Sequence, residues 1–254
     1  MNESLKHFFP DGKTVIVPID HGTAIPVPGL EHPAEVIESL KPWSDGFVVN
    51  GGILTACQEA LKGKGICLRT DVYKPPASPY RIFDTEDAIT LGAHAVMNML
   101  YPHNENEAEI TRECAYLIQQ GRDTGIPSII EALPFGLGMP EKYTVDEVAF
   151  TVRVAAELGA DVVKTAFPTG GTRDDFARIV DACPVPVVVL GGAQADDDAS
   201  ILRMVADSVS AGGSGIAIGR NVWQHQNPAK MAQALNEIVH GGATAEAAKS
   251  ILDS

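Results

Sequence analysis

The stretch Asp161-Val-Val-Lys-Thr-Ala-Phe-Pro-Thr-Gly-Gly171 places a lysine, Lys164, inside a short β-type run that ends at Pro168. Burying an unpaired ammonium is costly, so a buried strand rarely holds a lysine unless the side chain is partnered or loses its proton. As a free amine, Lys164 is able to attack a carbonyl carbon and form a Schiff base. The alternative is a lysine near the strand end that extends its ammonium into water. The surrounding sequence must decide between these two interpretations.

Short apolar runs alternate with amphipathic stretches along the whole chain. The predicted strands are 14–20, 46–50, 65–70, 93–101, 127–133, 161–167, 185–190 and 215–219. The predicted helices are 34–40, 51–61, 86–91, 105–120, one that begins at Thr144, 173–180, 198–210 and 228–240. Residues 71–84 are predicted to form a loop, and those after 240 a small alanine-rich tail. Glu147, three residues after Thr144, has the spacing of a helix capping box.

This alternation favours an α/β fold built as a single (β/α)8 TIM barrel. Nearly continuous apolar strands with helices between them indicate a parallel sheet covered on both faces. The chain has 254 residues, close to the roughly 250 typical of this barrel. No linker divides it, so residues 1–254 are expected to form one barrel domain. An open doubly wound sheet is the alternative, but no GxGxxG motif follows the first predicted strand.

Composition excludes several classes of function. A net charge of −14 argues against a nucleic-acid partner, because phosphate backbones require a basic face. No apolar run reaches the ~20 residues of a membrane span, and no basic-then-apolar leader follows Met1. A cytoplasmic location is therefore expected. The cysteines lack CxxC or zinc spacing and are expected to be free thiols; they are Cys57, Cys67, Cys114 and Cys183.

Polar residues cluster where the predicted strands end, which is where a (β/α)8 barrel carries its active site. They are Asp20 and His21 after the first strand, Asn50 after the second, Arg69 in the third, Glu131 in the fifth and Lys164 in the sixth. Side chains alternate along a strand. If Lys164 points inward, the same parity points Asp20 and Glu131 inward, in register with Ile16, Ile129 and Val162. Two carboxylates beside an amine form an arrangement suited to proton transfer.

Glycines end the last two predicted strands, as Gly191-Gly192 and Gly219-Arg220. Loops at these positions of a barrel commonly bind phosphate through backbone N–H groups, and Arg220 adds a charge-assisted donor. The alternative is that the glycines only permit tight turns. We expect a phosphate site here.

Each candidate side chain also has a structural interpretation. Asp20 could cap a helix, His21 could pack as a neutral imidazole, and Arg69 could pair with Asp20 or Glu131 rather than bind substrate. Three histidines are candidate metal ligands, but their spacing fits no standard site, so no metal is predicted. They are His94, His103 and His225.

In four segments, the sequence resembles the class I (Schiff-base) aldolases of the archaeal-type fructose-bisphosphate aldolase group, also called DeoC/LacD-like. The matching segments are Ile19-Asp-His-Gly22, Asp161-Val-Val-Lys-Thr165, Val189-Leu-Gly-Gly192 and Gly212-Gly-Ser-Gly-Ile-Ala-Ile-Gly-Arg-Asn-Val-Trp-Gln224. The resemblance implies that Lys164 forms the Schiff base and that Asp20 assists it. It also implies that the substrate phosphate is bound by Gly191, Gly192, Gly219 and Arg220.

One position departs from that group. The archaeal fructose-bisphosphate aldolases offer a tryptophan and an acid/base tyrosine in the fifth strand, whereas this chain has Glu131 and Leu133. The glutamate is similar to that of tagatose-bisphosphate and sulfosugar-phosphate aldolases. The resemblance therefore implies the class of chemistry more firmly than the substrate.

The sequence thus predicts reversible aldol cleavage of a ketose phosphate into dihydroxyacetone phosphate and an aldehyde, with Glu131 transferring the proton. No metal or organic cofactor is required, and the resemblance implies a homo-oligomer. The loops 71–84 and 134–143 are expected to select the aldehyde. Two alternatives stay open: the lysine-dependent thiolase (acyl-transfer) reaction of quorum-signal-processing relatives on a phosphorylated diketone, and a non-catalytic sugar-phosphate sensor.

Overall fold

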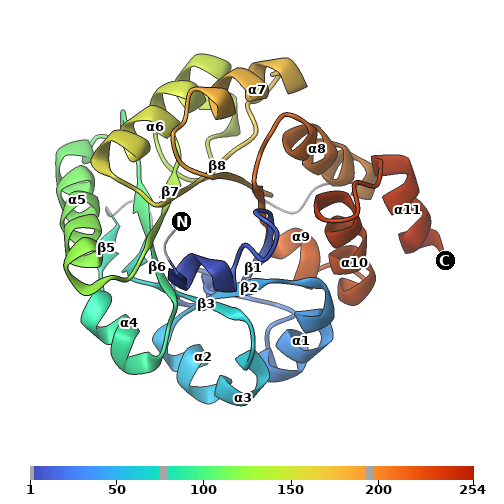
Figure 1. Ribbon diagram of the computed structural model, residues 1–254, viewed down its shortest axis with the longest axis horizontal. Helices are drawn as coiled ribbons and strands as arrows, with labels where there is room; N and C mark the ends of the chain where they lie inside the picture. Colours follow the sequence, from blue (N-terminus) through green and yellow to red (C-terminus); the bar gives the residue numbers. More distant parts are fainter. Residues whose placement is uncertain (1–2, 75–78, 193–196) are drawn as a thin grey trace.

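In the computed structural model, which describes residues 3–74, 79–192 and 197–254, eight parallel strands close into a barrel (Figure 1). The strands are β1 (Thr14–Pro18), β2 (Gly46–Val49), β3 (Gly65–Arg69), β6 (Ala95–Leu100), β7 (Ser128–Ala132), β8 (Val162–Thr165), β9 (Val187–Leu190) and β10 (Gly215–Ala217). Around the barrel they run β1-β10-β9-β8-β7-β6-β3-β2. The predicted TIM barrel is confirmed, and each predicted strand contains one of these strands.

Helices cover the outer face of the barrel as a ring (Figure 1). They are α1 (Pro33–Leu40), α2 (Gly51–Ala56), α3 (Gln58–Leu61), α4 (Thr85–Leu91), α5 (Glu107–Thr124), α6 (Val145–Leu158), α7 (Arg173–Asp181), α8 (Asp198–Ser210), α9 (Arg220–Trp223), α10 (Pro228–Val239) and α11 (Ala245–Asp253). Short 3-10 helices are η1 (Glu3–His7), η2 (His21–Thr23), η3 (Lys41–Trp43) and η4 (Pro140–Lys142). Within the described part of the chain, no helix is both long and apolar enough to cross a membrane.

Several local expectations need correction. The helix expected over 51–61 is two helices, because Cys57 leaves helical geometry at φ −115° and ψ 21°. The loop expected over 71–84 contains a small antiparallel hairpin of β4 (Asp71–Val72) and β5 (Tyr80–Arg81), while its residues 75–78 lie outside the described residues. The alanine-rich tail forms α11, because Thr244 caps it by accepting a hydrogen bond from the Ala247 N–H at 3.2 Å and alanine favours helix.

The start of α6 shows how tertiary contacts redirect a local motif. Thr144 caps the helix by accepting a hydrogen bond from the Glu147 N–H at 3.4 Å. The Glu147 carboxylate does not return to the Thr144 backbone, as a capping box requires. It pairs instead with His103 Nδ1 at 2.9 Å, and the His103 ring stacks on Phe150 of α6. The expected capping box is therefore only half formed.

The barrel interior is a separate apolar core that supports the site from below. It contains Ile16, Ile129 and Val162 together with side chains from the other barrel strands. Because side chains alternate along a strand, the next inward positions after Ile129 and Val162 are Glu131 and Lys164, as predicted. Residue Phe8, which follows η1, closes the amino-terminal end of this core: a Cβ on Gly65 would lie 2.5 Å from the Phe8 ring.

Candidate active site

A cavity of about 530 Å³ opens at the carboxyl ends of the barrel strands. Strands β1, β3, β6, β7, β8, β9 and β10 all contribute lining residues. Of the predicted site residues, those that line it are Asp20, His21, Arg69, Glu131, Lys164, Gly191, Gly192, Gly219 and Arg220. Closure of the barrel therefore brings together residues that are far apart in the sequence, such as Asp20 and Arg220.

Lys164 is buried, with 4% of the residue exposed. Parallel pairing of β7 and β8 sets Lys164 directly beside Glu131. The Lys164 Nζ lies 2.9 Å from Glu131 Oε1. The sequence left open whether this lysine extends into water; instead, its amine ends inside the cavity against a carboxylate.

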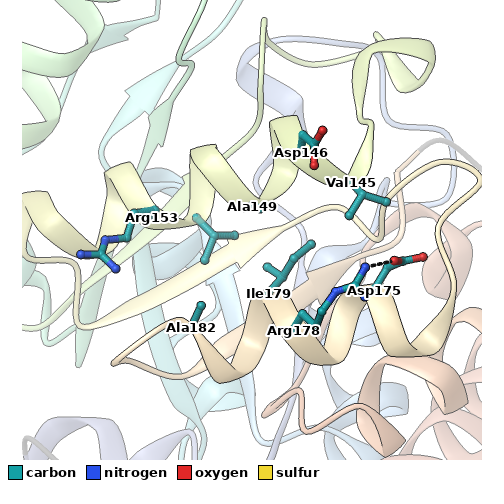
Figure 2. A pocket seen from close by; sticks show the side chains of 9 residues that line it. Val145, Asp146, Ala149, Arg153, Asp175, Arg178, Ile179 and Ala182 are labelled. Atoms are coloured by element: carbon teal, nitrogen blue, oxygen red, sulfur yellow. Dashed lines mark hydrogen bonds and ion pairs between the residues drawn. The ribbon is translucent and has the colours of Figure 1, made fainter.

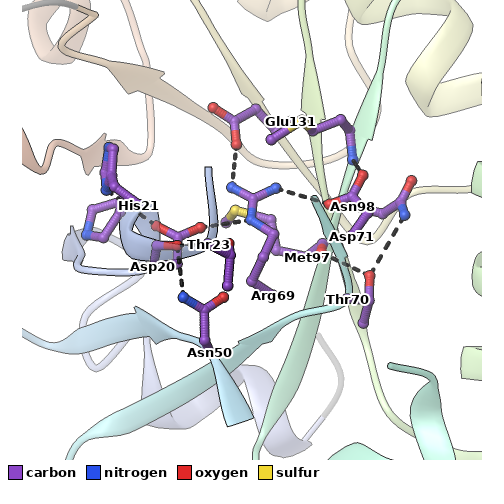
Figure 3. Close-up of polar contacts among 12 residues, drawn as sticks. Asp20, His21, Thr23, Asn50, Arg69, Thr70, Asp71, Met97, Asn98 and Glu131 are labelled. Atoms are coloured by element: carbon purple, nitrogen blue, oxygen red, sulfur yellow. Dashed lines mark hydrogen bonds and ion pairs between the residues drawn. The ribbon is translucent and has the colours of Figure 1, made fainter. Parts of the chain in front are cut away.

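Arg69 joins three carboxylates at the floor of the cavity (Figure 3). Its Nε lies 2.6 Å from Asp20 Oδ2, and its Nη1 lies 3.4 Å from Asp71 Oδ1. Its Nη2 donates to Glu131 Oε2. The guanidinium fork fixes the carboxylates in one geometry, so a continuous chain of charges runs from Asp20 through Arg69 and Glu131 to Lys164. The expectation that Arg69 pairs with Asp20 or Glu131 holds for both at once.

The three carboxylates have different proton affinities because they share these cations unequally. Burial alone would raise the pKa of Glu131, but the charges of Lys164 and Arg69 outweigh burial and lower that pKa to about 2. For Asp20, burial is likewise outweighed by Arg69 and other cations, so its pKa is lowered. For Asp71, burial dominates and Arg69 only partly offsets it, which raises the pKa to about 6. Glu131 is thus a charged base, whereas Asp71 titrates near neutrality.

Two predicted site residues lie next to Asp20: His21 faces the cavity, and Asn50 holds the Asp20 backbone. His21 lines the cavity and packs edge-on against Trp223, with ring centroids 5.6 Å apart. Burial lowers the pKa of His21, although the Asp20 charge works against it. Asn50 does not line the cavity. It was predicted to bind substrate, but its Nδ2 donates to the Asp20 backbone carbonyl at 2.7 Å, which makes it a support for Asp20.

The glycine-rich end of the cavity is closely packed. A Cβ on Gly191 would lie 2.7 Å from Ile218 Cγ2, and a Cβ on Gly219 would lie 2.6 Å from the Pro18 carbonyl. Gly192 has φ +66°, a backbone conformation that favours glycine. The Arg220 Nη2 donates to the Gly192 carbonyl at 3.0 Å. Turn geometry therefore requires these glycines, and it also leaves their backbone and a half-buried arginine facing the cavity.

Asp71 and Tyr143 line the cavity but were predicted only as members of the loops 71–84 and 134–143. Asp71 had a signal, because it stands two residues after Arg69 and shares its parity, but it was counted as loop. Tyr143 ends the loop 134–143, which was expected to select the aldehyde; its hydroxyl donates to the Gly136 carbonyl at 2.6 Å. Burial raises the pKa of Tyr143 to about 12, so it is a neutral donor. Of the loop residues expected to select the substrate, Tyr73 lines the cavity, whereas Arg81 pairs with Glu113.

The three histidines that were not expected to bind a metal each have a protein partner. His94 Nδ1 accepts from the Ile66 N–H at 3.1 Å, and His103 pairs with Glu147. His225 Nε2 lies 3.2 Å from Asp198 Oδ2. Among the described residues, no group of three or more potential metal ligands comes together.

A second cavity, of about 300 Å³, lies on the outside of the barrel between α6 and α7 (Figure 2). Its lining mixes apolar side chains such as Val145 and Ile179 with Asp175 and Arg178, which pair with each other. It contains none of the predicted site residues, so the chemistry is assigned to the cavity inside the barrel.

Comparison with known proteins agrees with the geometry. Residues 14–225 match the DeoC/LacD family aldolase model. The chain belongs to the DeoC/LacD aldolase family. It is 31% identical to 2-amino-3,7-dideoxy-D-threo-hept-6-ulosonate synthase 1 of Archaeoglobus fulgidus, covering 91% of this chain and 87% of that protein. It is 28% identical to an uncharacterised aldolase of Saccharolobus solfataricus, covering 96% of each.

Solved structures extend this to the mechanism. An archaeal fructose 1,6-bisphosphate aldolase superposes with a TM-score of 0.86 at 28% identity, covering 95% of this chain and 99% of the other. A second structure shows such an archaeal aldolase with its catalytic lysine bound covalently to the carbinolamine intermediate; its TM-score is 0.82 at 27% identity, covering 94% of this chain and 98% of the other. This aldolase is therefore a lyase of the class I, Schiff-base type. Its relatives act on different substrates, so its own substrate is not carried over.

Proposed function

We propose that this aldolase reversibly cleaves a ketose phosphate through a Schiff base on Lys164, giving dihydroxyacetone phosphate and an aldehyde. The observation that carries the proposal is the buried contact of the Lys164 amine with Glu131 at 2.9 Å, inside a cavity large enough for a sugar phosphate. A nucleophilic amine held beside a base is the arrangement that imine chemistry requires.

The first half of the reaction builds the Schiff base. Lys164 passes one proton to the adjacent Glu131, and its Nζ adds to the substrate ketone carbon. The proton held by Glu131 and a second proton from Nζ then pass to the former ketone oxygen, so Glu131 is ionised again before the carbon–carbon bond breaks. The carbinolamine then loses water and leaves an iminium. Asp20 assists both steps by relaying protons to and from the oxygen that departs as water. Because Arg69 holds Asp20 and Glu131 in fixed positions, neither carboxylate has to reorganise as the charges move.

The second half breaks the carbon–carbon bond. Glu131 accepts the proton of the hydroxyl next to that bond, the bond breaks, and its electron pair moves into the iminium to form an enamine. The aldehyde leaves first. A proton then returns to the enamine carbon, and water hydrolyses the iminium, which releases dihydroxyacetone phosphate and restores the Lys164 amine. General-base help of this kind contributes about 10²- to 10⁴-fold to the rate.

The phosphate is assigned to the glycine-rich end. Support comes from the positions of Gly191, Gly192, Gly219 and Arg220 in the cavity lining, since backbone N–H groups and a guanidinium are good phosphate donors. His21 lies between this end and Asp20 and is proposed to contact the substrate. Asn50 is proposed to act through Asp20, because its side chain holds the Asp20 backbone.

Borohydride trapping tests the proposal directly. The aldolase is incubated with dihydroxyacetone phosphate, reduced, and mapped by peptide mass spectrometry. We expect a reduced adduct on Lys164 that is absent in Lys164→Ala. A bound ligand without an adduct on any lysine would overturn the mechanism and favour a sensor. Activity that depends on coenzyme A would favour the thiolase reaction.

The proposal also covers the cellular location and the oligomeric state of the aldolase. The free cysteines, three of which are buried, fit a reducing compartment such as the cytoplasm. We also propose that the aldolase works as a homo-oligomer, which sedimentation at micromolar concentration would test.

A further inference from the structure

The cavity has two chemically different ends, set by the order of strands around the barrel. The glycine-rich turns follow β9 and β10. In the closed order β1-β10-β9-β8-β7-β6-β3-β2, the strands diametrically opposite β10 and β9 are β6 and β3. Lys164 on β8 stands between the two ends. A substrate anchored by phosphate near Arg220 and linked to Lys164 therefore extends its other half toward β7, β6 and β3.

That far end is largely apolar. Its side chains are Val72, Tyr73, Met99, Leu133, Leu137 and Tyr143, all of which line the cavity; we call this set the apolar wall. Val72, Met99, Leu133 and Tyr143 are buried, with exposed fractions of 8% or less. Burying a hydrocarbon part of a ligand against this surface is favourable, whereas placing a strongly hydrated group there costs the free energy of removing its water.

The charges at the far end are unsuited to a second anion. Among the described lining residues, Arg69, on β3, is the arginine on this side of the barrel, and its guanidinium is already shared by Asp20, Asp71 and Glu131. Lys74 and Lys142 follow or flank the wall in sequence, but neither lines the cavity. By sequence, segments 75–78 and 193–196 contain no lysine, arginine or histidine. A second phosphate would thus face carboxylates without a cation of its own.

We propose that the substrate of this aldolase is a ketose monophosphate whose aldehyde half is uncharged and largely apolar, rather than a sugar bisphosphate. The inference rests on the proposed function for the placement of the phosphate and the ketone. Juxtaposing like charges in a desolvated site is strongly unfavourable, while the apolar wall favours an aldehyde with a carbon chain.

Carbonyl-free ligands test this without requiring any aldol reaction. Binding of hexyl phosphate, hexane-1,6-diyl bisphosphate and glucitol 1-phosphate is measured by calorimetry at one ionic strength. We expect hexyl phosphate to bind at least about tenfold more tightly than the bisphosphate, since one uncompensated charge contact is enough for that ratio. It should also bind more tightly than glucitol 1-phosphate, whose hydroxyls would face the apolar wall. Equal or tighter binding of the bisphosphate, or of glucitol 1-phosphate, overturns the inference.

A pair of variants tests whether the apolar wall causes the preference for the monophosphate. Leu137→Lys puts an ammonium into the apolar wall at a half-buried position, whereas Met139→Lys adds the same charge at an exposed residue that does not line the cavity. We expect Leu137→Lys to reverse or abolish the preference for the monophosphate, and Met139→Lys to keep it. A preference that is unchanged in both variants would show that the apolar wall does not set it and would overturn the inference.

The two proposals fail separately. If borohydride traps no adduct but hexyl phosphate is still preferred over the bisphosphate, the Schiff-base proposal falls and the ligand class stands. If Lys164 is trapped and the bisphosphate binds better, the chemistry stands and the ligand class falls. Where aldol addition is active, its kcat/KM with butanal should exceed that with glyceraldehyde 3-phosphate.

Discussion

Arg69 contacts three buried carboxylates of this site, and Lys164 contacts one of them. Glu131 lies between Arg69 and Lys164, so its pKa falls to about 2 in spite of burial. Burial raises the pKa of Asp71 to about 6, and Arg69, which Asp71 shares with two other carboxylates, only partly offsets that effect. Unequal environments that separate the pKa values of neighbouring carboxyl groups are typical of sites that move protons. Near neutral pH, Glu131 is ionised, whereas Asp71 is able to exist in both forms.

Glu131→Gln should separate proton transfer from Schiff-base formation. The amide keeps the size and the contact with Lys164 but cannot accept the hydroxyl proton, so kcat for cleavage should fall about 10²- to 10⁴-fold. The borohydride adduct on Lys164 should still form, although more slowly, because Glu131 no longer takes the Lys164 proton while Asp20 remains to relay protons during carbinolamine formation and dehydration. Steady-state kinetics and trapping on one preparation check both points. Full activity in Glu131→Gln would show that another group takes the proton.

Much of this site followed from residue parity. Glu131 and Lys164 were expected to point inward because they sit two positions from Ile129 and Val162, and they do. The three-way sharing of Arg69 could not be predicted, since its geometry depends on the exact register of β1, β3 and β7. The contact of the Asn50 amide with the Asp20 backbone carbonyl could not be predicted for a similar reason, because a strand-end amide serves a ligand or a backbone carbonyl equally well until the neighbouring loop is placed.

At the scale of elements, an ion-pair cluster joins the end of α10 to the amino-terminal side of the barrel. His240 Nδ1 lies 2.9 Å from Asp11 Oδ2, and its Nε2 lies 2.9 Å from Asp45 Oδ2. Asp45 also accepts from the Val15 N–H at 2.7 Å. Hydrogen bonds from His240 to Asp45 are the main cause that raises the pKa of His240 to about 9, against the opposing effect of burial.

This cluster predicts a pH-dependent stability. Because the folded-state pKa of His240 is raised from 6.5 to about 9, its contribution is fully present below 6.5 and is lost as pH rises through 9. His240→Gln should therefore lower the free energy of unfolding by about 1–2 kcal/mol at low pH, as for other partly buried charged histidines at helix ends, and by little above 9. Urea unfolding at a pH one unit below 6.5 and one unit above 9 measures it.

A matched control is His32→Gln, which removes an exposed histidine at the start of α1. It should change the unfolding free energy little at either pH. The same loss for His240→Gln at both pH values would mean that the imidazole acts by packing alone and not by charge.

Element boundaries show where sequence patterns are sufficient and where they are not. The helix α8 (Asp198–Ser210) was predicted to the residue, whereas the longer α5 was expected over 105–120 and spans Glu107–Thr124. The hairpin of β4 and β5 and the short helix α9 were missed, because two-residue strands and a single helical turn carry no periodicity to detect. Their formation depends on tertiary contacts, such as the Trp223 Nε1 donating to the Pro18 carbonyl at 3.0 Å.

For the whole molecule, barrel closure is what turns scattered sequence signals into one site. The strand count and the nearly continuous apolar runs were enough to predict the barrel. Closure brings the turn after β10 against β1, where Thr14 pairs with Gly215 and Ile16 with Ala217. As a result, Arg220 and Asp20 line one cavity although they lie at opposite ends of the chain. A ligand that spans these strands should therefore stabilise the fold as a unit.

Ligand-dependent unfolding makes this measurable. Glycerol 3-phosphate, which has the phosphate but no carbonyl, should stabilise the aldolase by about 2.7 kcal/mol at a hundredfold excess over its Kd, which raises Tm by several degrees. In Arg220→Gln that rise should be largely lost, because the charged donor at the glycine-rich end is gone. Arg178→Gln is the matched control, since Arg178 is exposed on α7 and pairs with Asp175 outside the cavity; there the rise should persist. An unchanged rise in Arg220→Gln would place phosphate binding elsewhere in the molecule.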